Sequence, residues 1–190
     1  PYAGTSYGVG NYCTCNRVAL FQGHDSSNTL AGGPTLTQAN LTIYRTQNDN
    51  RVFGTHGMRS GKYYWEFLVS GHTRTSLGIS YSIMGAANYG DEYHRAGDYG
   101  LACESTTQTK FASQSYTSVS YLSSAYAVTD VIGVAFDADN GTLYISKNGV
   151  WGNSGNPATG TNPLISSIPT ANYVPFWAGG GDYPSSATLQ

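Results

Sequence analysis

The chain has 190 residues, of which 11% are charged, and its formal net charge is −2. This length suits one sizeable hydrophobic core, and the absence of a basic stripe excludes a nucleic-acid binder that works by charge. No run of about 18 apolar residues occurs, so we expect no membrane span. Tyr, Ser, Gly and Asn are abundant, which is typical of strands and also of binding loops.

The N-terminal part of the chain shows the weakest strand-forming sequence pattern. Residues 1–16 are rich in Gly, Tyr, Asn and Thr and are predicted to form an irregular arm. Arg17–Gln22 is a short predicted strand, and Gly23–Pro34 is dense in loop-forming residues. We therefore divide the chain into an irregular arm with a loop-rich lead-in at 1–34 and a β domain at 35–190.

Short β segments separated by turn residues follow. Alternating or apolar runs, bounded by Gly, Ser, Asn or Pro, predict strands. No segment shows the helical period over more than a turn or two, so we predict an all-β, antiparallel β-sandwich with little or no helix. Met84–Gly97 is predicted to be a long loop, and 112–124 a solvated stretch or sheet edge. The predicted strands are Thr35–Arg45, Tyr63–Val69, Thr75–Tyr81, Asp98–Cys103, Gln108–Phe111, Val131–Phe136, Thr142–Ser146 and Asn172–Ala178.

The clearest pattern lies in Val131–Gly149. Asn140-Gly141 suits the positive φ angles of a tight two-residue hairpin turn. In the strand that follows, Leu143 and Ile145 share one face. Asn148-Gly149 signals a second turn. The stretch predicts two neighbouring antiparallel strands.

Catalytic and metal-binding motifs are not recognisable. The three Glu residues form no readable carboxylate pair, and the four His lack metal-ligand spacing. Asp137–Gly141 resembles the start of a calcium loop, but its Gly comes one position early and no Glu follows at the twelfth position. A hairpin turn is favoured there instead. We predict no enzymatic activity, no cofactor and no metal site.

The three cysteines, Cys13, Cys15 and Cys103, match neither a zinc site nor a disulfide framework. Pairing of one of the first two with Cys103 and three reduced thiols both remain open. The chain begins at Pro1 and shows no signal peptide, so we expect a processed or partial chain.

Several segments in order resemble the SPRY (B30.2-like) domain. Gly61–Glu66, GKYYWE, is similar to that family's G-(K/R)-x-Y-W-E strand, and Leu77–Ile79 to its V-G-(I/V) strand. Asp130–Gly149 resembles the G-D-x-I-G-V-x-L-D…N-G signature, although Thr129 replaces the usual Gly before it. Val174–Phe176 matches a late apolar-Pro-apolar strand. The family's final strand is not obvious after residue 182.

The resemblance covers about residues 35 to 180 and is closest in style to viral and bacterial members. It implies a non-catalytic sandwich that binds protein or peptide ligands through loops at one edge, here Asn48–His56 and Tyr89–Arg95. Trp151 is either such an anchor or a packing side chain. The candidate ligand-binding residues are Arg51, Thr55, His56, Tyr89, Tyr93, His94, Arg95, Trp151 and Tyr173.

Three functions fit these features. The leading one is a recognition module on a virion or other extracellular assembly, such as a receptor-binding or appendage protein, with a cytoplasmic location as the alternative. The second is a structural subunit of a capsid, tail or filament, joined through arm 1–16 and edge strands. The third is a lectin-like domain in which Tyr89, Tyr93 or Trp151 stacks on a sugar. The expected partners are a protein or glycan ligand and a homo-oligomer or larger assembly.

Overall fold

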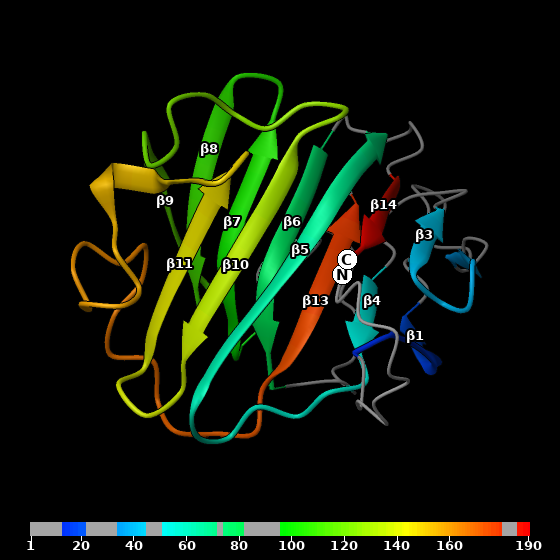
Figure 1. Ribbon diagram of the computed structural model, residues 1–190, viewed down its shortest axis with the longest axis horizontal. Coiled ribbons are helices and arrows are strands. Elements are labelled where there is room, and N and C mark those ends of the chain that lie inside the picture. Colours follow the sequence, from blue (N-terminus) through cyan, green and yellow to red (C-terminus); the bar gives the residue numbers. More distant parts are fainter. Residues whose placement is uncertain (1–12, 22–33, 45–50, 72–73, 82–95, 180–185) are drawn as a thin grey trace, which may run out of the picture.

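The computed structural model describes residues 13–21, 34–44, 51–71, 74–81, 96–179 and 186–190. These residues form two antiparallel sheets of seven strands each, packed face to face (Figure 1). The one helical segment among them is η1 (Gly152–Ser154), a three-residue 3-10 turn. The predicted antiparallel β-sandwich is confirmed.

The first sheet contains β1 (Cys15–Phe21), β4 (Arg51–Gly54), β6 (Arg74–Ser80), β7 (Asp98–Glu104), β8 (Thr107–Ala112), β9 (Ser115–Val119) and β13 (Val174–Gly179). Their order across the sheet is β1-β4-β13-β6-β7-β8-β9. Strands β6 to β9 follow one another as a meander, while β13 returns late in the chain to lie between β4 and β6. Strands β1 and β9 form the two edges.

The second sheet contains β2 (Thr35–Thr37), β3 (Thr42–Tyr44), β5 (Lys62–Gly71), β10 (Val131–Asp137), β11 (Thr142–Lys147), β12 (Val150–Trp151) and β14 (Ser186–Leu189). Their order is β12-β11-β10-β5-β14-β3-β2. Strand β10 pairs with β5 on one side and β11 on the other, without a register shift. These three strands form the most regular part of the sheet.

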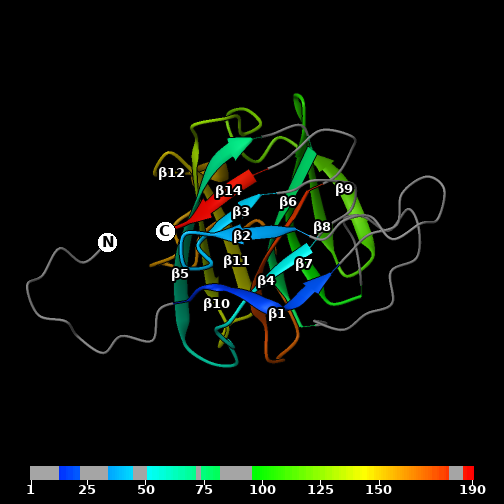
Figure 2. The same ribbon diagram turned by 90° about the vertical axis from the view of Figure 1, so that its right-hand side faces the viewer.

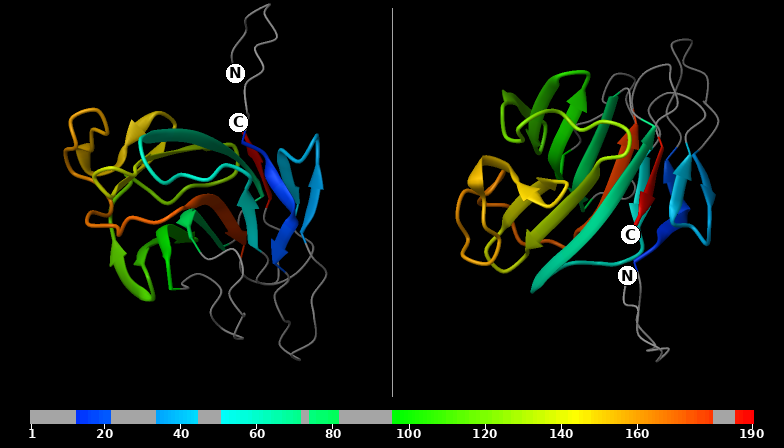
Figure 3. Two further views of the ribbon diagram at one scale, coloured as in Figure 1. Left: turned by 90° about the horizontal axis from the view of Figure 1, so that it is seen from below. Right: turned by 45° about the horizontal axis from the view of Figure 1, so that its top comes forward.

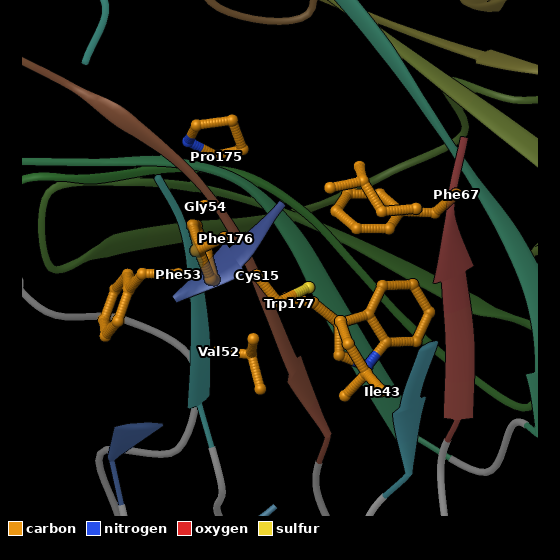
Figure 4. A pocket seen from close by; sticks show the side chains of 10 residues that line it. Cys15, Ile43, Val52, Phe53, Gly54, Phe67, Pro175, Phe176 and Trp177 are labelled. Atoms are coloured by element: carbon orange, nitrogen blue, oxygen red, sulfur yellow. The ribbon is translucent and has the colours of Figure 1, made fainter. Parts of the chain in front are cut away.

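Alternate residues of each strand fill the space between the sheets. On β5, Trp65, Phe67 and Val69 are buried, as the two-residue period predicts. The Phe67 ring meets that of Trp177 from the opposite sheet at a centroid distance of 5.3 Å. Figure 4 shows Trp177 between Phe67 and Ile43, at a void of about 10 Å³. A void this small with apolar walls is packed core and not a ligand site.

The turn between β10 and β11 is longer than predicted. Asp137 pairs with Thr142, so the turn spans the four residues 138–141 and the predicted two-residue turn at Asn140-Gly141 is wrong. The Asp137 carboxylate accepts hydrogen bonds from the backbone N–H groups of Asp139 and Asn140, at 3.1 and 3.0 Å. These bonds satisfy the donors of the wider turn.

The second turn of this stretch is confirmed. Lys147 pairs with Val150, so Asn148-Gly149 is a two-residue turn between β11 and β12. Its φ angles are 50° and 79°, as a type I′ turn requires.

Two strand boundaries in the first half differ from the prediction. The single strand expected over Thr35–Arg45 is split into β2 and β3, because Gln38–Asn40 adopt positive φ angles of 51°, 56° and 65°. The expected loop at Asn48–His56 contains β4, so its described part is mainly strand. Thr55 and His56 follow the end of that strand.

The predicted arm and lead-in at 1–34 contribute to the sandwich. Strand β1 lies within them and pairs with β4, and it begins two residues before the predicted strand Arg17–Gln22. Residues 1–12 and 22–33 lie outside the described residues. At the other end of the chain, β14 pairs with β5 and β3, so a final strand that the sequence did not reveal is present.

The outer face of the first sheet carries a buried ion pair among aromatic rings. The Arg51 guanidinium carbon lies 4.9 Å from the ring centre of Phe176 and 5.6 Å from that of Phe53. Its Nη2 pairs with the carboxylate of Asp98, and the two side chains are 2% and 0% exposed. Charges this deeply buried depend on each other, because neither has water to solvate it.

We expect Arg51→Met to lower the free energy of unfolding by about 3–5 kcal/mol, because it leaves the Asp98 charge buried without its cation. The matched control is Arg74→Met, whose ion pair with Glu104 is 35% and 58% exposed and should contribute about 1 kcal/mol or less. Urea denaturation of the three proteins measures both effects. Equal losses for the two variants would contradict this role of Arg51.

Candidate binding surface

Aromatic side chains gather on the outer face of the second sheet near β12. The ring centroid of Trp151 lies 6.1 Å from that of Tyr64 and 6.3 Å from that of Tyr144, both edge-on. Tyr144 is fully buried, Trp151 is half-buried and Tyr64 is 55% exposed. Exposure therefore increases from Tyr144 through Trp151 to Tyr64. All three residues lie on paired strands.

Gly133 allows Tyr64 to lie across the sheet. A Cβ at Gly133 would be 2.7 Å from the Tyr64 hydroxyl and closer still to that of Ser146. The Tyr64 hydroxyl donates a hydrogen bond to the Glu66 carboxylate. Burial of the hydroxyl and this bond raise the pKa of Tyr64 to about 12, so the phenol is protonated at neutral pH. The exposed ring is thus held in one orientation.

A hollow of about 310 Å³ lies beside Trp151, and we call it the Trp151 hollow. One wall is the segment 120–123 and the other is β12 with η1. The backbone N–H of Asn153 donates to the carbonyl of Tyr121 at 2.8 Å and joins the two walls. Val150, which is 70% exposed, lies at its border. The lining residues are Ser120, Tyr121, Leu122, Ser123, Lys147, Val150, Trp151, Gly152, Asn153 and Ser154.

A polar network fixes residues 124–130, which follow the wall at 120–123 along the chain. The Lys147 amine donates to the Ser124 hydroxyl at 2.8 Å and to the Ala125 carbonyl at 3.0 Å, and it pairs with the Asp130 carboxylate at 3.0 Å. The Asn148 amide donates to the same carboxylate at 2.8 Å. The segment that follows the wall is therefore tied to the end of β11, one turn before Trp151.

The Asp130 carboxylate is held in its charged form. Burial raises its pKa, but hydrogen bonds from the Ala127 N–H, the Asn148 amide and the Lys147 amine outweigh that effect. The net result is a pKa below the ordinary value for an aspartate. The network is consequently intact at neutral pH.

Two predicted contact residues, Thr55 and His56, lie elsewhere. Thr55 is exposed, and its hydroxyl accepts a hydrogen bond from the Thr14 N–H at 3.1 Å. His56 is half-buried, with its ring 5.6 Å from that of Tyr63. Both follow β4, which Figure 1 shows on the side of the sandwich away from β11. The structure does not bring them together with Trp151.

Two other predicted contacts are corrected. Arg51 belongs to the buried ion pair, and Tyr173 is 1% exposed among the rings of Tyr81, Tyr99 and Phe136, with centroid distances of 5.5–6.0 Å. Side chains at these depths pack the fold and do not offer a surface to a ligand. The remaining predicted contacts, Tyr89, Tyr93, His94 and Arg95, lie outside the described residues.

Sequence reasoning missed Tyr64, Val150 and the wall at 120–123. Alternation on β5 could have revealed Tyr64, because Trp65 and Phe67 face the core and their neighbours must face outward. No local signal places residues 120–123 beside β12, since that contact depends on how the two sheets pack.

Within the described ranges, no group of three or more His, Cys, Asp or Glu side chains is placed to hold a metal ion, and no helix is long and apolar enough to cross a membrane. Cys13, Cys15 and Cys103 are free thiols. Burial raises the pKa of Cys15 to about 12 and that of Cys103 to about 11, so both are protonated and unreactive at neutral pH.

A model of the SPRY domain matches residues 62–160. The chain belongs to the SPRY family. The predicted family is therefore confirmed, and SPRY domains are in general non-enzymatic protein-interaction modules. A search of curated proteins finds no match.

Solved structures share the fold of this SPRY domain. The SPRY domain of human HERC1 is 14% identical, with a TM-score of 0.61 over 81% of this chain and 90% of that one. The PSpry domain of TRIM65 is also 14% identical, with a TM-score of 0.61 over 83% of each chain. Stonustoxin is 18% identical, with a TM-score of 0.62 over 94% of this chain but 27% of its own. At these identities the likeness shows the fold alone.

We expect the stability of the SPRY domain to depend on pH through Asp130. A folded-state pKa below the ordinary value stabilises the fold above about pH 4, and the contribution is lost as the pH falls through the folded-state pKa. Asp130→Asn should be less stable at pH 7 and should lose less stability between about pH 4 and pH 2. Urea denaturation across this range measures both curves, and parallel curves would contradict the role of Asp130.

Proposed function

We propose that this SPRY domain is a non-enzymatic recognition module that binds a protein ligand through the Trp151 hollow and the Tyr64 ring beside it. The observation that carries the proposal is the exposed ring of Tyr64 in edge contact with the half-buried Trp151, which lines a hollow of about 310 Å³. Trp and Tyr are the side chains most often found at the centres of protein interfaces.

The rigidity of this surface also supports binding. Trp151 pairs with Ser146 in the sheet, and the Tyr64 hydroxyl is held by Glu66. A side chain already held in its bound position loses little conformational entropy when a ligand arrives. The hollow can receive one projecting side chain of a partner, while Val150 borders it and Tyr64 adds an exposed ring beside Trp151.

The setting that we propose is extracellular or on a virion surface, as part of a receptor-binding or appendage protein. The weakly charged composition, with 11% charged residues, supports a surface that binds by shape and hydrogen bonding. Antibodies raised against the chain should label the exterior of the particles or cells that carry it. Label confined to the cytoplasm would contradict this setting.

A neutral glycan is the second candidate ligand. The Trp151 hollow combines an indole with hydroxyl and amide groups from Ser120, Ser123, Asn153 and Ser154. Lys147, the one charged residue among the lining residues that the structure describes, is engaged by Asp130. Hydroxyl and amide groups pair with sugar hydroxyls, and an aromatic face packs on the apolar face of a sugar ring, so an uncharged saccharide suits this lining.

The protein-binding proposal predicts that peptides selected from a display library on the immobilised domain bind Tyr64→Ala at least tenfold more weakly than the wild type. Trp151→Ala should show a similar loss. Tyr44→Ala is the matched control, because Tyr44 is 48% exposed on β3 in the same sheet, away from Trp151. Titration calorimetry measures the dissociation constants, and thermal unfolding confirms that each variant is folded. Unchanged affinity for both test variants would overturn the proposal.

The glycan proposal predicts binding of at least one neutral saccharide on a glycan array, with that signal lost in Trp151→Ala and retained in Tyr44→Ala. An array on which the wild type binds no glycan would contradict it and leave the protein-binding proposal standing.

A further inference from the structure

The four edges of the two sheets differ in their protection against pairing with another strand. Strands β2 and β12 have three and two residues, and short edges offer few backbone groups. Strand β1 has seven residues, but its pairing with β4 shifts register between Cys15 and Leu20. Such a bulge turns an edge away from regular pairing.

Strand β9 has none of these protective features. Its five residues pair with β8 without a register shift. It contains no Pro and no charge, and no charged residue occurs between Lys110 and Asp130. Ser115–Ser118 are all exposed. Strand β9 lies at the border of the first sheet in Figure 2 and Figure 3.

The outer side of this strand is suited to accept another strand. In an antiparallel ladder, alternate residues of an edge strand direct their N–H and C=O groups away from the sheet. Proteins usually cover such groups or place Lys or Pro among them, because an open edge invites association. A regular, uncharged and exposed edge of five residues therefore indicates an interaction surface.

We propose that two copies of this chain associate through β9, with the two strands antiparallel about a two-fold axis at Thr117. The association joins the first sheets of the two copies into one continuous sheet. Thr117 of one copy then faces Thr117 of the other. Tyr116 of each copy faces Ser118 of the other, and Ser115 faces Val119. This self-complementary arrangement is the isologous contact of a symmetric dimer.

The composition of β9 favours a second copy over a different protein. Opposed residues in the pairing are hydroxyl against hydroxyl or polar against aliphatic, and no like charges meet. A strand that selects a charged partner would carry the complementary charge, and β9 carries none. Because one five-residue pair buries less area than a standard interface, we expect a dissociation constant in the micromolar range or weaker.

This dimer is independent of the proposed ligand-binding function. No residue of β9 lines the Trp151 hollow, so substitutions on β9 leave that surface intact. Failure of self-association and failure of ligand binding can therefore be distinguished in the same variants.

Sedimentation equilibrium of the chain from about 10 μM to 1 mM tests the association, since weak dimers form in this range. The average mass should rise from 20.2 kDa toward twice that value. A mass that stays at 20.2 kDa up to the highest concentration would overturn the proposal.

Charge substitutions test the pairing geometry. Thr117→Lys and Thr117→Glu should each weaken self-association at least tenfold, because like charges then face each other at the axis. An equimolar mixture of the two variants should regain the dimer. Thr37→Lys on the short edge strand β2 is the matched control, since Thr37 is also an exposed edge threonine, and it should associate as the wild type does. Association unaffected by either Thr117 variant, no recovery in the mixture, or an equal loss in Thr37→Lys would each overturn the proposed axis.

Discussion

Burial of every second side chain of β5 is the constraint on which both the core and the candidate surface depend. Trp65, Phe67 and Val69 point between the sheets, and Phe67 meets Trp177 of the opposite sheet. The pleat then forces Tyr64 to point outward. A shift of the strand by one residue would exchange the two faces and remove the core contacts, so packing fixes the register and with it the position of Tyr64.

The Trp151 hollow also depends on a small set of interactions that hold more than one element. Lys147 and Asn148 bind the Asp130 carboxylate and so hold the segment 124–130, which follows the wall at 120–123. They also begin the tight turn that leads to β12 and Trp151. The network at the end of β11 therefore joins the segment next to one wall of the hollow to the turn that leads into the other. A binding surface supported in this way is ordered before any ligand arrives, which reduces the entropy lost on binding.

The strands of the central hairpin could be predicted because their signals are local. The Asn148-Gly149 turn is correct because both residues tolerate positive φ and nothing competes with the two-residue turn. The turn before it differs because the Asp137 carboxylate supplies bonds that stabilise four residues. The split between β2 and β3 was missed because Ala39, at a φ of 56°, is no usual turn residue.

The candidate site was less predictable, since it depends on contacts between distant residues. Arg51 was expected at the surface because the family resemblance places it in a contact loop and Arg is a frequent interface anchor, but Asp98 on β7 provides the partner that permits burial. Trp151 was a candidate in the sequence because it is a large aromatic that follows a turn. The hollow beside it could not be predicted, because its opposite wall comes from the connection between β9 and β10.

Hydrogen–deuterium exchange of the domain with and without a selected peptide tests the central claim most directly, because it reports the bound surface without altering a residue. The account predicts that bound peptide slows exchange in 120–124 and 150–154, with smaller effects at Thr55 and His56. Slowed exchange confined to segments away from the Trp151 hollow would contradict it.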